Sequence, residues 1–259
     1  MKIETVLAAS DMNPLYSEFI PSFIKSWSIL FPEVDIIVVL VADSIPDTLL
    51  EYSTHIRLFK PIDNIHTAFQ AQCIRLLYPQ FITRNGGVLI TDMDMLPMNR
   101  FYYEDAIKNI SDDTFISYRD VLLPYQIPMC YNIALPNVWK NMFDGETLEN
   151  WYLGTNYSGI PGTGGWCTDQ HMLMTKFNEY SGTKIILNDD ITKFNRLDRS
   201  SEWQFYNLNE LRNKIGNGEY SDYHSLRPYS RHKELNDFIV ESLIHTRPGV
   251  QNQDKDEVS

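Results

Sequence analysis

Residues 88–97, VLITDMDMLP, run from a branched apolar stretch into two aspartates and back into apolar residues. A short apolar run of this kind predicts a buried strand, and alternation along a strand would point Asp92 and Asp94 to the same side. Two carboxylates at the end of a strand offer the hard oxygen ligands that Mg²⁺ and Mn²⁺ take. The alternative is a pair of solvated turn acids, but the apolar residues on both sides favour a ligand site.

Strand and helix patterns alternate ahead of this stretch. They predict strands at residues 3–10, 34–41, 56–60 and 87–91, and helices at 16–31 and 68–81. Strands separated by helices predict βαβ units, and therefore an α/β fold with a Rossmann-like, mostly parallel central sheet flanked by helices. Such sheets bind ligands at the carboxyl ends of their strands, where Asp92 and Asp94 stand.

The second half of the chain is less regular. We expect strands at 114–117, 130–135 and 184–187, helices at 138–143, 168–180 and 233–245, and a loop at 152–165. No internal repeat and no linker-like composition divides the chain, so one domain is predicted over residues 1–248. Residues 249–259 are polar and are predicted to form a flexible tail.

Composition excludes several classes of protein. The formal net charge is −12, and no block of Lys or Arg occurs, which disfavours nucleic acid as a partner. The three cysteines form no C-x-x-C pair, so neither a zinc site nor a disulfide framework is expected. We find no signal peptide and no transmembrane segment, and therefore expect a soluble, cytoplasmic protein.

Three further stretches resemble motifs of one enzyme group. Residues 73–79 (CIRLLYP) resemble the R-L-x-x-P segment that precedes the DxD strand in GT-A fold nucleotide-sugar glycosyltransferases of the glycogenin and lipopolysaccharide galactosyltransferase group. Residues 164–170 (GGWCTDQ) are similar to the D-Q element of that group, and residues 224–229 (HSLRPY) to its element of a His followed by Lys-Pro-Trp. The resemblance spans roughly residues 3–230 and implies a GT-A fold.

The resemblance also implies a metal centre. Asp92, Asp94 and His224 would be its protein ligands, with Mn²⁺ as the expected ion and Mg²⁺ as the alternative, because an imidazole nitrogen suits the later transition ions. Arg75 would act at the nucleotide sugar, and Arg227, which replaces Lys, would contact the diphosphate. The alternatives are an exposed helix arginine at position 75 and a surface histidine at position 224.

Five more residues enter as candidates. By the same resemblance, Asp169 would hold a hydroxyl of the donor sugar and Gln170 would sit beside the anomeric carbon as the catalytic pair; the alternative for Asp169 is a helix cap. Ala8 and Asp11 end the first strand and would touch the base and ribose. Asp43 ends the second strand and could accept from a uracil N–H. Each of these three could instead be a turn residue.

The function implied is transfer of a sugar from a nucleoside diphosphate, with UDP as the expected nucleotide, to a hydroxyl of a glycan or another acceptor, with retention. Residues 1–100 would form the nucleotide-binding half and 101–248 the acceptor and sugar half. Two alternatives stay open. One is a phosphohydrolase of the haloacid-dehalogenase type with Asp92 as nucleophile, although such enzymes usually carry D-x-D on the first strand. The other is a nucleotide-sugar-binding domain without catalysis.

Overall fold

A computed structural model describes residues 1–160, 162–201, 203 and 207–245 of the chain. The tail predicted at 249–259, and the last residues of the domain predicted over 1–248, lie outside the described residues. No helix in the described part of the chain is both long enough and apolar enough to cross a membrane.

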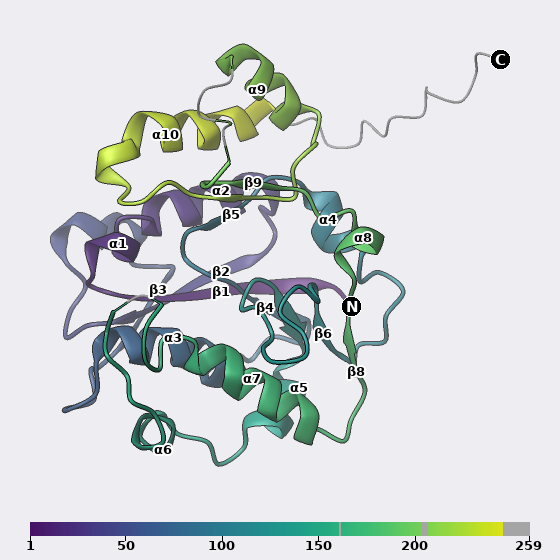
Figure 1. Cartoon of the computed structure of the whole chain (residues 1–259). Helices are drawn as coiled ribbons and strands as arrows, with labels where there is room; N and C mark the ends of the chain where they lie inside the picture. The colour runs from purple at the N-terminus through teal and green to yellow at the C-terminus, as the bar shows by residue number, and fades with distance from the viewer. Residues whose placement is uncertain (161, 202, 204–206, 246–259) are drawn as a thin grey trace.

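A seven-stranded sheet forms the centre of the molecule (Figure 1). Its order is β3-β2-β1-β4-β7-β6-β8, and β7 alone runs antiparallel to its neighbours. The mostly parallel sheet predicted from the sequence is thus confirmed. The strands are β1 (Ile3–Asp11), β2 (Asp35–Val41), β3 (Ile56–Phe59), β4 (Gly87–Ile90), β6 (Phe115–Ser117), β7 (Asn132–Ala134) and β8 (Lys184–Ile186).

Helices cover both faces of this sheet (Figure 1). On one face lie α3 (Thr67–Leu77), α5 (Pro136–Phe143), α6 (Leu148–Leu153) and α7 (Thr168–Glu179). On the other lie α2 (Ile20–Leu30) and, outside it, α9 (Leu208–Gly216) and α10 (Lys233–Ser242). The branched side chains of β2 alternate between the two apolar clusters, with Val38 in one and Val39 in the other, because successive strand residues face opposite sides.

Shorter elements complete the chain. They are the helices α1 (Pro14–Ser17), α4 (Arg100–Asp105) and α8 (Asp189–Thr192), and 3₁₀ turns at Asp47–Tyr52, Tyr78–Phe81, Ser230–His232 and Leu243–His245. One apolar cluster contains side chains from β1 through to the last 3₁₀ turn, so both halves of the chain share a core.

Two predicted helices are interrupted at prolines. The helix expected over 16–31 is divided into α1 and α2, with Pro21 in the first turn of α2. Proline has no N–H to donate, and its ring clashes with the carbonyl four residues earlier, which here belongs to Ser17. The helix expected over 68–81 ends at Leu77 and continues as a 3₁₀ turn containing Pro79, which has no N–H to donate to the carbonyl four residues earlier.

A second, three-stranded sheet was not predicted. It consists of β5 (Met95–Pro97), β10 (Asp222–His224) and β9 (Arg196–Asp198), with β10 in the middle, antiparallel to β5 and parallel to β9. β9 (RLD) and β10 (DYH) are mostly polar and β5 (MLP) ends in a proline, so none of the three shows the apolar run of a buried strand. This sheet matters for the site, because β5 directly follows the two aspartates and β10 ends at His224.

Asp222 fixes the small sheet to the main one. Its side chain is fully buried and accepts hydrogen bonds from the Tyr131 hydroxyl at 2.7 Å and from Nε and Nη2 of Arg196 at 2.9 and 2.6 Å. Tyr131 stands just before β7, so this carboxylate connects two sheets and one arginine. A buried carboxylate is tolerated only when its charge and lone pairs are satisfied in this way.

We expect Asp222→Asn to lower the free energy of unfolding by about 3 kcal/mol, because it leaves Arg196 half-paired in a buried position. Urea unfolding followed by circular dichroism measures the difference. Asp144→Asn, which changes an exposed acid in the same way, is the matched control and should unfold like the parent chain. Equal stability of the Asp222 and Asp144 variants would contradict the anchoring role of Asp222.

Candidate active site

The two aspartates lie in a turn rather than on a strand. β4 ends at Ile90 and β5 begins at Met95, so Asp92 and Asp94 occupy the connection between the two sheets. The strand alternation expected from the sequence therefore does not explain their direction. Both carboxylates nevertheless line one cleft, because the turn itself presents them there.

This cleft gathers most of the predicted site residues. It lies past the carboxyl ends of β1 and β4 and encloses about 900 Å³ when space open to solvent is counted. Eight of the residues singled out in the sequence line it: Asp11, Arg75, Asp92, Asp94, Asp169, Gln170, His224 and Arg227. The remaining two, Ala8 and Asp43, do not: Ala8 is fully buried in the core and Asp43 is exposed beyond β2.

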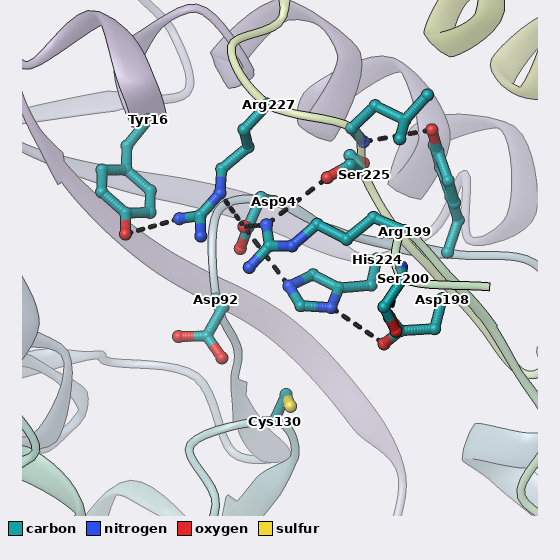
Figure 2. A network of polar contacts seen from close by, with 12 residues as sticks. Tyr16, Asp92, Asp94, Cys130, Asp198, Arg199, Ser200, His224, Ser225 and Arg227 are labelled. Atoms are coloured by element: carbon teal, nitrogen blue, oxygen red, sulfur yellow. Dashed lines mark hydrogen bonds and ion pairs between the residues drawn. The ribbon is translucent and has the colours of Figure 1, made fainter. Parts of the chain in front are cut away.

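Asp94 is the most strongly neutralised acid of the cleft (Figure 2). Its side chain is 5% exposed, and its Oδ2 lies 2.8 Å from Arg199 Nη1, 3.5 Å from Arg227 Nε and 3.6 Å from His224 Nε2. Burial raises the pKa of this carboxyl, but the hydrogen bond and charge of His224, followed by the two arginines, outweigh burial and hold the pKa well below its usual range. Asp94 is therefore ionised.

His224 is oriented by a second carboxylate. Its Nδ1 lies 3.0 Å from Asp198 Oδ2, at the end of β9 (Figure 2). Burial raises the pKa of Asp198, and hydrogen bonds from the hydroxyl and amide of Ser200, with His224, lower it to about 2. Nε2 points toward Asp94, and a ring that binds a metal through Nε2 would donate its Nδ1 proton to Asp198, which is how histidines that bind metals are usually held.

Arg75 connects the two aspartates' turn to α7. Its Nη1 is ion-paired with Asp92, and its Nη2 donates to Asp169 Oδ2 at 2.6 Å. The same arginine donates from Nη1 to the carbonyl of Thr91 at 3.2 Å and from Nε to that of Gln72 at 3.0 Å. It is 6% exposed, so the alternative of an exposed helix arginine is wrong.

Asp169 and Gln170 open α7 on the wall of the cleft. Asp169 is 2% exposed, and its Oδ1 accepts the backbone N–H of Gln170 at 2.9 Å; the N-cap of α7 is Cys167, so Asp169 lies in the first turn and does not cap the helix. Burial raises the pKa of Asp169, and Arg75 acts in the opposite direction. The Oε1 atom of Gln170 is buried and has no hydrogen-bond partner among the described residues. A buried amide oxygen without a partner is costly unless a ligand supplies one.

The N-terminal wall of the cleft holds Asp11 and a residue that the sequence analysis missed. Asp11 accepts the N–H of Asn13 at 3.0 Å and the hydroxyl of Thr67 at 2.8 Å, so its position is fixed by α1 and α3. Tyr16 lines the cleft and accepts a hydrogen bond from Arg227 Nη1 at 2.6 Å. Burial raises the pKa of this phenol.

Arg199 and Asp198 were also missed. Asp198 is the last residue of β9 and Arg199 follows it, in a stretch for which no element was predicted, and neither belongs to a motif of the resembled group. Their types alone give little signal, since an Asp-Arg pair is common on surfaces. Their roles follow from the small sheet, which brings β9 beside β10 and so beside His224.

The cleft contains side chains of the types that bind a divalent cation. In this structure the two carboxylates are ion-paired with arginines instead. Two carboxylates and one imidazole form a ligand set that suits Mn²⁺ and can hold Mg²⁺. In the described part of the chain, however, no group of three or more His, Cys, Asp or Glu side chains converges as a metal site. Arg75 is ion-paired with Asp92, and Arg199 and Arg227 lie 2.8 and 3.5 Å from Asp94 Oδ2. These arginines therefore stand where a cation bound to the two carboxylates would lie.

Solved structures identify the fold. The galactosyltransferase LgtC, in complex with donor and acceptor sugar analogs, matches with a TM-score of 0.51 and 13% identity over 96% of this chain and 98% of LgtC. The glycosyltransferase GlyE of Streptococcus pneumoniae TIGR4 matches with a TM-score of 0.54 and 12% identity over 94% of this chain and 61% of GlyE. A glycosyltransferase involved in the glycosylation of the major capsid of PBCV-1 matches at 0.50 and 7%, over 91% and 100%.

These matches confirm the predicted GT-A fold. No protein-family model matches the sequence, and neither does any curated protein. At identities of 7 to 13%, the likeness extends to the fold alone.

We expect Arg75→Gln to lower the free energy of unfolding by about 3 kcal/mol at neutral pH, because Asp169 is left buried without its counter-charge. Without Arg75 the pKa of Asp169 rises further. A carboxyl with a raised folded-state pKa destabilises the fold above its unfolded-state pKa. The loss relative to the parent chain should therefore be larger near pH 7 than near pH 5.

Urea unfolding at the two pH values measures this difference. Arg84→Gln, which removes an exposed arginine 3.6 Å from Asp35, is the matched control and should change little at either pH. A loss that is the same at both pH values would mean that the Arg75–Asp169 charge pair is not its cause.

Proposed function

We propose that this chain is a metal-dependent glycosyltransferase that moves a sugar from a nucleoside diphosphate, with UDP as the nucleotide, to a hydroxyl of a glycan or another acceptor. One observation carries the proposal. In a GT-A fold, a single cleft contains Asp92, Asp94 and His224 beside three arginines, so ligands for a cation and donors for a diphosphate face the same space. Residues 1–100 would hold the nucleotide, and residues 101–248 the sugar and acceptor.

The leaving group is the part of the donor that this cleft suits best. Asp92, Asp94 and His224 would hold Mn²⁺ or Mg²⁺, an ion that neutralises charge on the diphosphate when bound. Arg227 is positioned for the phosphates by the Tyr16 hydroxyl and lies over the Tyr16 ring, 5.1 Å from its centroid. Fixed cations assist most when charge develops on the leaving group, because they need not reorganise.

The reacting carbon would lie near Gln170. Its unpartnered Oε1 can face the positive charge that develops at the anomeric carbon in an oxocarbenium-like transition state. Asp169 has one oxygen on Arg75 and the other on a backbone N–H, so it suits a contact with a sugar hydroxyl better than proton abstraction from the acceptor. This favours retention over inversion.

The proposed transfer needs no separate base to take the proton of the acceptor hydroxyl. The bond from the anomeric carbon to the diphosphate oxygen breaks, and a bond to the acceptor oxygen forms on the same face of the sugar. The acceptor proton passes to the departing phosphate oxygen, which becomes basic as it leaves. Arg75 would hold Asp169 beside the reacting centre through its hydrogen bond from Nη2.

Neither alternative reading gains support. The two solved structures compared above, LgtC and GlyE, are glycosyltransferases and not phosphohydrolases. Asp92 is ion-paired with the buried Arg75, and this pairing makes its carboxylate a weaker nucleophile. The unpartnered Gln170 Oε1 would also accept a sugar hydroxyl in a binding domain, so turnover separates that alternative from an enzyme. Both alternatives are outcomes of the experiments that follow.

A panel of nucleotide sugars incubated with Mn²⁺ tests the function. We expect one donor to be hydrolysed slowly to free sugar and nucleotide, with little activity in chelator, because water replaces the missing acceptor. Asp94→Asn should reduce this rate by about 100-fold or more, since the acid is central to the cation site; Asp144→Asn is the control. Release of inorganic phosphate instead of nucleotide would identify a phosphohydrolase.

Gln170→Ala tests the catalytic amide. We expect turnover to fall by about 100-fold while the Kd of the donor nucleotide changes little, because the contact forms chiefly in the transition state. Single-turnover rates and calorimetric binding separate the two quantities. Gln80→Ala, in the 3₁₀ turn after α3, is the control. A loss confined to donor affinity would exclude the catalytic role.

A further inference from the structure

Arg199 is held less firmly than the other arginines near the cleft. In the described residues its hydrogen bonds all use Nη1, which donates to Asp94 Oδ2 at 2.8 Å and to the carbonyl of Ser225 at 3.5 Å. Arg196, three residues earlier, instead contacts both oxygens of a buried carboxylate. A guanidinium has five N–H groups. Among the described residues Nε and Nη2 of Arg199 have no hydrogen-bond acceptor, so these N–H groups can donate to a ligand in the cleft that Arg199 lines.

Arg199 and a divalent cation would need the same oxygen. Asp94 Oδ2 faces Arg199 at 2.8 Å and His224 Nε2 at 3.6 Å, so an ion held between Asp94 and His224 would meet the guanidinium directly. Like charges repel strongly in a site that is largely shielded from water. One of the cations around Asp94 must move when another arrives.

Arg199 is the cation able to move. Arg227 lies farther from Asp94 Oδ2, at 3.5 Å, and is retained by the hydroxyl and ring of Tyr16. Among the described residues Arg199 has no comparable second anchor, although the two side chains are equally exposed, at 25%. Its long stem can turn about several bonds within the cleft that Arg199 and Arg227 both line.

We propose that Arg199 exchanges one anion for another: it neutralises Asp94 until a divalent cation binds there, and then binds the diphosphate of the donor. The inference rests on the proposed function of the cleft and assigns it a further substrate-binding residue. Arg199 thereby couples the two binding events, because the group that the cation displaces is a group that the diphosphate requires. The arriving phosphates supply the negative charge that the guanidinium loses on leaving Asp94.

If Arg199 exchanges Asp94 for the diphosphate, one substitution should raise the affinity for Mn²⁺ and lower the affinity for UDP. Arg199→Gln removes a competitor, so Mn²⁺ alone should bind about 5- to 10-fold more tightly. The same variant lacks a charge-assisted hydrogen bond to phosphate, so UDP in saturating Mn²⁺ should bind about 10- to 100-fold more weakly. Arg199→Lys keeps the positive charge but lacks the paired N–H donors of a guanidinium. It should bind Mn²⁺ like the parent chain and bind UDP with an affinity between those of the parent chain and Arg199→Gln.

Mn²⁺ binding by electron paramagnetic resonance and UDP binding by calorimetry in saturating Mn²⁺ provide the two readouts. Arg84→Gln is the control, because it changes net charge equally at an exposed site away from the cleft. Near-ultraviolet circular dichroism verifies that each variant is folded. If Arg199→Gln alone is unfolded, Arg199→Lys still tests the exchange through its predicted split between parental Mn²⁺ affinity and weakened UDP affinity.

The two binding measurements distinguish failure of the Arg199 exchange from failure of the proposed glycosyltransferase function. Tighter Mn²⁺ together with weaker UDP supports the exchange. Mn²⁺ affinity equal to that of Arg84→Gln, or UDP affinity equal to that of the parent chain, would overturn it while leaving the glycosyltransferase proposal intact. Failure of the parent chain itself to bind Mn²⁺ and UDP would overturn both.

Discussion

A buried negative charge at Asp94 imposes the main constraint on this structure. A carboxylate that is 5% exposed must be surrounded by cations and donors, and here they come from Arg199, His224 and Arg227. The backbone of the same residue is also engaged, because its carbonyl accepts the N–H of Ser225 at 2.9 Å. Asp94 therefore determines where the small sheet and the segment after it lie relative to the main sheet.

Arg75 imposes the complementary constraint on the opposite wall. It is a buried cation that requires anions, and it obtains them from Asp92 in the turn and Asp169 on α7. The cleft thus has a positive residue fixed by two acids on one side and an acid fixed by three basic groups on the other. Apolar packing of the sheet supports both walls, but charge pairing sets the positions of the side chains that face the ligand space.

The sequence predicts the frame well, because the central strands of the main sheet are buried on both faces and read as continuous apolar runs, of which residues 34–41 are the clearest. It does not predict the small sheet, because β9 and β10 are mostly polar and β5 ends in a proline, nor the breaks at Pro21 and Pro79, where the missing proline N–H overrides helical spacing. In the site, short motifs identify Asp92, Asp94 and Arg75. Arg199 follows no motif and is recognisable only once β9 is seen to lie beside β10.

The separation along the chain between Asp94 and its partners also orders events during synthesis. Arg199 follows Asp94 by 105 residues, which at about 5–20 residues per second corresponds to roughly 5–20 s of translation. The parallel strands β1 to β4 leave the ribosome before any of the basic groups that later surround this carboxylate. Until then water can solvate Asp94, so no unpaired charge is buried. A nascent chain that stops short of residue 199 therefore carries the acidic turn without the groups that neutralise it.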